Sequence, residues 1–96
     1  MAVIRLTRFK IDPAHTQEML ARRAALIAAV RDAFPGLVEA RLAKVEDETW
    51  IDLWRWRSLG NAQAAIAGAS TIPEAAAAFA VTRDVGMEYA ELVDER

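Results

Sequence analysis

An aspartate and an arginine are the side chains best placed to do acid–base chemistry in this chain. Asp52 lies within residues 49–57, Thr-Trp-Ile-Asp-Leu-Trp-Arg-Trp-Arg, and Arg23 lies in the middle of the apolar stripe of the preceding predicted helix. A buried unpaired charge is costly, so the two side chains either pair or Arg23 bends out to solvent. If they pair beside a pocket, Asp52 can act as a base toward an acidic phenol while Arg23 holds the resulting oxyanion.

Three tryptophans lie in the same segment at alternate positions. Successive side chains of a strand point to opposite faces, so Trp50, Trp54 and Trp56 share one face with Asp52. Wide aromatic walls with few polar groups suit a flat, apolar ligand. Trp50 and Trp54 are therefore candidate substrate-binding residues. The alternative is that the indoles are ordinary core side chains.

Two further residues are weaker candidates for binding substrate. His15, the only histidine, is either a surface residue or a proton carrier near the pocket mouth. Tyr89, the only tyrosine, either offers its hydroxyl to a ligand or packs in an interface. With no cysteine, one histidine, and an acidic run at residues 46–48 typical of a solvated turn, we expect neither a metal nor a cofactor.

Length and composition predict one domain spanning residues 1–96. The chain is 54% hydrophobic and 27% charged with a net charge of −2, which is typical of a globular protein and not of a nucleic-acid-binding one. Arg5 follows the start too closely for the apolar core of a signal peptide, and no apolar run reaches the roughly 20 residues of a membrane span. We therefore expect a cytoplasmic protein with no membrane partner.

Local signals divide the chain into four strands and two helical regions. Asp12-Pro13 starts a helix, Pro35-Gly36 stops it, and Ser58 can cap a second one. The expected elements are strand 2–11, helix 13–34, strand 37–45, strand 49–57, helix 59–67, a helical piece from 73 to about 83, and strand 87–93 after a break at Gly86.

This order, β-α-β-β-α-β, predicts a ferredoxin-like α+β fold with a four-stranded antiparallel sheet and strands one and three in its centre. Both helices then cover one face. We expect the other face to present Ile51 and Leu53, with Val3, Phe9 and Ile11 from strand one, as a large apolar patch. A second copy of the chain would bury that patch in a homodimer.

Three short motifs, in order, carry a family resemblance. They are Phe9-Lys10-Ile11-Asp12-Pro13 before the first helix, Pro35-Gly36 before strand two, and Trp54-Arg55-Trp56-Arg57-Ser58 before the second helix. With these motifs the whole chain resembles the antibiotic-biosynthesis-monooxygenase-like family of dimeric α+β barrels. The resemblance implies a homodimer in which two sheets face each other, with Arg55 and Arg57 at its rim reaching acidic groups of the partner.

The family's site residues carry over only in part. Trp56 looks like the match of a pocket tryptophan in cofactor-free monooxygenases and is a candidate catalytic residue. Four residues earlier those enzymes carry an Asn, whereas this chain has Asp52, which when ionised only accepts hydrogen bonds. Haem-degrading members need a strand-one Asn and a later His, whereas this chain has Leu6 and only His15.

Two functions follow from the resemblance. The first is a cofactor-independent monooxygenase acting on a phenolic or quinone-like aromatic, with Asp52, Trp56 and Arg23 as catalytic residues. The second is a non-catalytic small-ligand-binding or stress-associated homodimer on the same fold, which the replacement of Asn by Asp52 favours.

Overall fold

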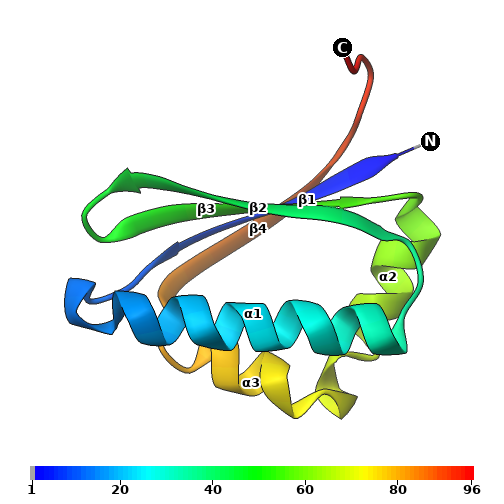
Figure 1. The fold of residues 1–96 in the computed structure, drawn as a ribbon. Coiled ribbons are helices and arrows are strands. Elements are labelled where there is room, and N and C mark those ends of the chain that lie inside the picture. The colour runs from blue at the N-terminus through cyan, green and yellow to red at the C-terminus, as the bar shows by residue number, and fades with distance from the viewer. Residues whose placement is uncertain (1) are drawn as a thin grey trace.

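The structure is a computed structural model that describes residues 2–96 and arranges them in two layers, a sheet and a layer of helices (Figure 1). Its strands and α-helices are β1 (Val3–Lys10), α1 (Thr16–Ala33), β2 (Leu37–Glu46), β3 (Thr49–Trp56), α2 (Leu59–Ala67), α3 (Pro73–Phe79) and β4 (Arg83–Glu91). Short 3-10 turns at Pro13–His15 and Ala69–Thr71 precede α1 and α3.

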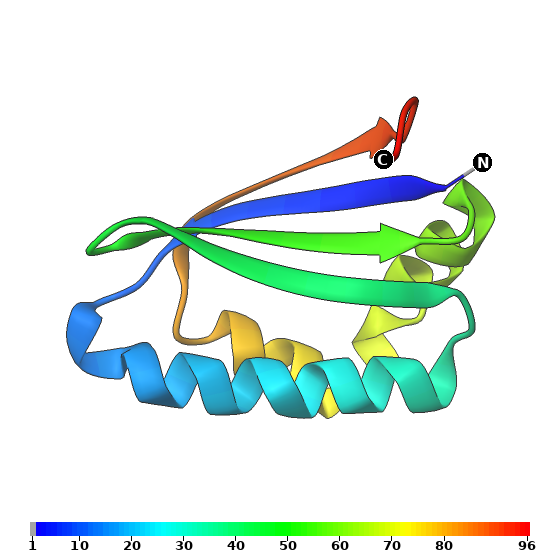
Figure 2. The same ribbon diagram turned by 45° about the horizontal axis from the view of Figure 1, so that its top comes forward.

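The sheet has the strand order β2-β3-β1-β4, and all its neighbours are antiparallel. α1 runs along one face of the sheet with α3 beside it, and α2 stands at one end (Figure 2). The predicted ferredoxin-like α+β fold, with β1 and β3 in the centre, is confirmed. None of the helices within residues 2–96 is long and apolar enough to cross a bilayer.

The pairing of β1 with β3 decides which side chains face the helices. Val3 lies opposite Trp56, and Phe9 opposite Trp50. Partners directly opposite each other in an antiparallel pair point to the same face. Val3 and Phe9 therefore share the helix-covered face with the tryptophans, and they and Ile11 are buried. The prediction that Val3, Phe9 and Ile11 line the uncovered face is wrong, because strand register sets the face and a shift of one residue reverses it.

We call the helix-covered side of the sheet the inner face and the opposite side the outer face. Ile4 and Leu6 of β1 and Ile51 and Leu53 of β3 lie on the outer face and are half-buried. Arg55, also on this face, forms ion pairs within its own chain with Glu39 at 3.5 Å and with Glu95.

Two separate apolar clusters form the core beneath the helices. One surrounds Trp56 and includes Val3, Val30, Ala62, Ala65, Ile72 and Ala75. The other surrounds Trp50 and includes Phe9, Ile11 and Met19. Because Trp56 and Trp50 are six residues apart on β3, the clusters lie toward opposite ends of the inner face. The middle of that face is left to Asp52 and Trp54 of β3, with Thr7 and Arg5 opposite them on β1.

The helix and strand boundaries near the C-terminus differ from the prediction. α3 ends at Phe79 rather than near Arg83, and β4 begins at Arg83 rather than at Met87. Gly86 lies inside β4, opposite Arg8, and does not break it. The ladder to β1 outweighs the local preferences of an alanine run and a glycine, since tertiary pairing routinely overrides propensity.

Candidate functional site

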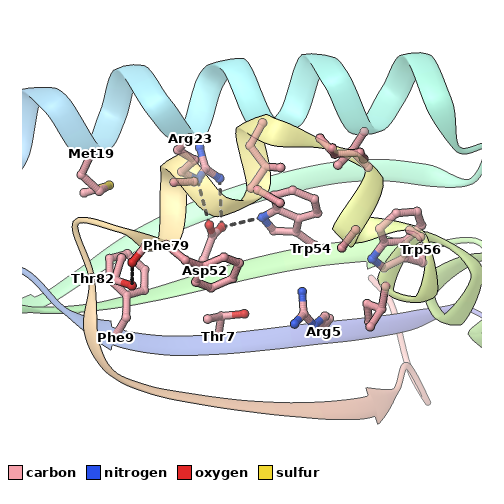
Figure 3. A pocket seen from close by; sticks show the side chains of 18 residues that line it. Arg5, Thr7, Phe9, Met19, Arg23, Asp52, Trp54, Trp56, Phe79 and Thr82 are labelled. Carbon is pink, nitrogen blue, oxygen red and sulfur yellow. Dashed lines mark hydrogen bonds and ion pairs between the residues drawn. The ribbon is translucent and has the colours of Figure 1, made fainter.

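A pocket lies between the inner face of the sheet, α1 and the segment from α2 to α3 (Figure 3). Most of its 18 lining residues are apolar, among them Leu26, Val30, Ile72 and Phe79. The charged lining residues are Arg5, Arg23 and Asp52. The pocket therefore has apolar walls and a small polar strip, which suits a mainly apolar ligand oriented by a few polar contacts.

Arg23 and Asp52 form a two-bonded ion pair in this pocket. Arg23 Nε donates to Asp52 Oδ2 at 2.9 Å, and Arg23 Nη2 donates to Asp52 Oδ1 at 3.0 Å. The two side chains are only 18% and 13% exposed. The pairing that the sequence left open is thus present, and the apolar stripe of α1 contains an arginine because a carboxylate on β3 neutralises it. Three N–H groups of Arg23 have no acceptor among residues 2–96 and can donate to a ligand.

Trp54 completes the hydrogen bonding of Asp52. Its indole Nε1 donates to Asp52 Oδ1 at 2.9 Å, so the carboxylate accepts three hydrogen bonds (Figure 3). The Trp54 and Trp56 rings lie 6.4 Å apart between centroids and are tilted by 34°. Asp52 therefore fixes both the guanidinium of α1 and one aromatic wall of the pocket.

Trp56 is almost completely buried, with an exposed fraction of 2%, yet it lines the pocket. Its Nε1 is buried and has no hydrogen-bond partner among residues 2–96. A buried donor of this kind usually has a partner, so this N–H is available to an acceptor on a ligand.

Arg5 is a pocket residue that the sequence reasoning missed. It lies on the inner face of β1, opposite Trp54 of β3 and Tyr89 of β4. Burial lowers the pKa of its guanidinium from the ordinary value, while Tyr89 and Asp52 act in the opposite direction. Its position two residues after Val3 could have revealed it, had Val3 been assigned to the tryptophan-bearing face.

The remaining predicted site residues lie outside the pocket lining. Trp50 is buried in the apolar cluster with Phe9, and Lys44 Nζ lies 5.8 Å from the centre of its ring. His15 ends the 3-10 turn before α1 and is exposed. Tyr89 is 42% exposed on the edge strand β4. The structure thus brings Arg23, Asp52, Trp54 and Trp56 together and leaves Trp50, His15 and Tyr89 apart from them.

No protein-family profile and no curated protein sequence matches the chain. Solved structures do. SnoaB, a cofactor-independent oxygenase from Streptomyces nogalater, is 22% identical with a TM-score of 0.74, over 98% of this chain and 95% of that one. A protein from Caulobacter crescentus, assigned as an antibiotic biosynthesis monooxygenase, is 20% identical with a TM-score of 0.79, over 97% and 91%.

A mutant of MhuD with two manganese protoporphyrin IX molecules bound per active site is also similar. It is 22% identical with a TM-score of 0.69, over 98% of this chain and 97% of that one. The chain therefore has the fold of the antibiotic biosynthesis monooxygenase structures, and the resemblance seen in the sequence is confirmed for the fold over nearly its whole length.

Proposed function

We propose that this protein is a cofactor-independent monooxygenase acting on a phenolic or quinone-like aromatic molecule. The observation that carries the proposal is the Arg23–Asp52 ion pair, placed between indole walls in an otherwise apolar pocket. Shared fold with a cofactor-independent oxygenase adds support. Fold alone does not define a reaction, so the argument depends on the site.

In the proposed reaction the substrate itself reduces dioxygen. Asp52 takes the proton of an acidic phenol or enol, and free N–H groups of Arg23 hold the oxygen anion. The anion passes one electron to dioxygen, and the two radicals combine to form a C–O–O bond at the ring carbon. Cleavage of the O–O bond with loss of a C–H proton leaves a new carbonyl, and the proton held by Asp52 completes one molecule of water. Apolar walls favour these steps by excluding bulk water.

A second candidate is a ligand-binding homodimer without catalysis. The favouring observation is that Arg23 and Trp54 already donate three hydrogen bonds to Asp52. Each of these bonds stabilises the ionised carboxylate, so taking a substrate proton competes with them. In that case Asp52 positions Arg23 and Trp54, and the pocket holds its ligand unchanged.

We also propose that two copies associate through their outer faces. Ile4, Leu6, Ile51 and Leu53 form a half-buried apolar surface there, on the side of the sheet that none of the helices within residues 2–96 covers (Figure 1). Burying such a surface against a second copy contributes about 25 cal/mol for each Å². A symmetric dimer is the commonest solution for a single chain of this size.

Oxygen consumption separates the two candidate functions. The protein is freed of metal with a chelator and supplied with anthrones and hydroquinones, with spontaneous oxidation subtracted. An oxygenase consumes oxygen, and Asp52→Asn and Trp56→Phe lower the rate at least tenfold, whereas Asp32→Asn, an exposed position near the end of α1, leaves it unchanged. Ligand binding by calorimetry without any oxygen uptake would favour the binder.

A further inference from the structure

The charges that line the pocket do not balance. Arg23 and Asp52 neutralise each other, which leaves the positive charge of Arg5. No carboxylate of residues 2–96 lies within 4.0 Å of the Arg5 guanidinium. The Nη2 atom of Arg5 contacts the uncharged Sδ of Met87 on β4. The residues that line the pocket therefore include one cation that has no ion-pair partner among residues 2–96.

None of the acidic side chains near Arg5 forms an ion pair with it within residues 2–96. Asp52 already accepts three hydrogen bonds. Glu88 of β4 lies opposite Leu6 and so belongs to the outer face, while Glu91 lies opposite Val3 at the end of the strand and makes no ion pair with Arg5. Within the described part of the chain, the half-buried guanidinium of Arg5 therefore has no carboxylate in direct contact, although Asp52 lies close enough to raise its pKa.

A second unpartnered donor belongs to another residue that lines the same pocket. Register places Arg5 opposite Trp54 and diagonal to Trp56, whose buried Nε1 has no acceptor in residues 2–96. Figure 3 shows Arg5 between Thr7 and Trp56, on the floor of the pocket opposite α1. A planar guanidinium fork binds oxygen atoms that carry negative charge well, and an indole N–H in the same pocket can donate to a further acceptor of the ligand.

We propose that the pocket selects a flat aromatic ligand with one anionic oxygen group, and that Arg5 binds that group. A neutral ligand of the same shape leaves a desolvated Arg5 without a counter-charge, which is unfavourable. A monoanion restores neutrality. The lowered pKa of Arg5, caused by burial, is consistent with a group that lacks a full counter-charge. This inference takes the pocket of the proposed function as the binding site and names the charge of its ligand.

Two pairs of probes test the charge preference by calorimetry. The pair 2-naphthoate and 2-naphthamide compares a carboxylate with its neutral counterpart, and the pair 4-nitrophenol, at a pH where it is ionised, and 4-nitroanisole compares a phenolate with a neutral ether. We expect the anion of at least one pair to bind about 10- to 100-fold more tightly, the range that charge-assisted hydrogen bonds give. The pair that shows the preference identifies the anion as carboxylate or phenolate.

The variants then assign the preference to Arg5. Arg5→Gln should abolish it by weakening binding of the anion, while affinity for the neutral probe should be kept or rise because no charge is left to desolvate; retained binding of the neutral probe also shows that the pocket is intact. Arg31→Gln, the same change at an exposed position in the last turn of α1, should retain it. Arg5→Lys, which keeps the charge without the planar fork, should retain part of it.

Equal binding of charged and neutral probes by the wild type, including no binding of any probe, would overturn the inference, as would a preference that persists in Arg5→Gln. The result is separable from the test of the proposed function because it needs no oxygen. A charge preference without oxygen uptake supports the inference and counts against the oxygenase. Oxygen uptake without a charge preference supports the oxygenase and counts against the inference.

Discussion

Replacing Asp52 with alanine should destabilise the fold by about 2–4 kcal/mol. The change removes the acceptor of three hydrogen bonds and leaves the Arg23 guanidinium, only 18% exposed, without its counter-charge. Breaking a fully buried pair costs about 3–5 kcal/mol, and the residual exposure of both side chains lowers that range somewhat. For a domain of this size each kcal/mol corresponds to roughly 4–8 °C in Tm, so Tm should fall by about 10 °C or more.

A double-mutant cycle with Arg23→Met tests the reasoning behind that magnitude. The double variant carries no buried charge at either position, so it should be more stable than the sum of the single losses predicts. We expect a coupling free energy of about 1–3 kcal/mol. Urea unfolding followed by tryptophan fluorescence gives the four stabilities, at equal chain concentration because a dimer's stability depends on it.

Asp32→Ala, on the exposed surface of α1, is the matched control and should change stability by no more than about 0.5 kcal/mol. Additivity of the single losses within about 0.5 kcal/mol would show that Arg23 and Asp52 do not stabilise each other in solution. The ion pair would then fail as the organising feature of the pocket.

Substitutions at four further positions have directions fixed by the structure. Gly68→Ala should lower the free energy of unfolding by about 1–3 kcal/mol, because its Cβ would lie 2.2 Å from Cζ of Phe34. Gly60→Ala, in the first turn of α2, should raise that free energy by about 0.5–1 kcal/mol, because the nearest atom to its Cβ would be 3.8 Å away. Chemical denaturation measures both. Ser58→Ala removes the hydroxyl that accepts from Asn61 N at 3.1 Å and should cost about 1 kcal/mol in the same assay, while Ser58→Asp should restore most of it. Leu6→Glu places a charge in the proposed interface, and light scattering should then report the single-chain mass of 10.6 kDa in place of twice that value; a wild type that already has the single-chain mass would contradict the proposed dimer.

Most of the fold could be predicted because its signals are local. Asp12 Oδ1 accepts from Ala14 N at 3.0 Å, as an N-cap should, although the turn that it opens is a 3-10 turn before α1 begins at Thr16. Gly36 has a φ of +102°, which favours glycine and fits the predicted stop after α1. Each of these signals acts over a few residues and survives any tertiary arrangement. The start of β4 has no such local signal, because it depends on pairing with β1, a strand that is distant in sequence.

The face of each residue on β1 could not be predicted from that segment alone. Val3, Phe9 and Ile11 have one parity, and Ile4 and Leu6 have the other, so both faces of the strand look apolar. Only the register against β3 chooses between them, and the sequence does not encode that register locally. The consequence goes beyond packing, because the parity that carries Val3 inward also carries Arg5 inward.

Arg23 and Arg5 differ in how visible they are in the sequence, and the difference has a physical cause. A helix has one apolar stripe, so a charge inside the stripe contradicts the pattern and points to a partner. A strand with apolar residues on both faces has no one-sided hydrophobic pattern. An arginine in such a strand therefore violates no pattern, and Arg5 does not stand out in the sequence. Its importance follows only from the register, which places it beneath Trp54 and between the two apolar clusters. The pocket is lined by members of both clusters and by the polar residues between them, and the proposed preference for an anionic ligand depends on the one cation among these that has no ion-pair partner within residues 2–96.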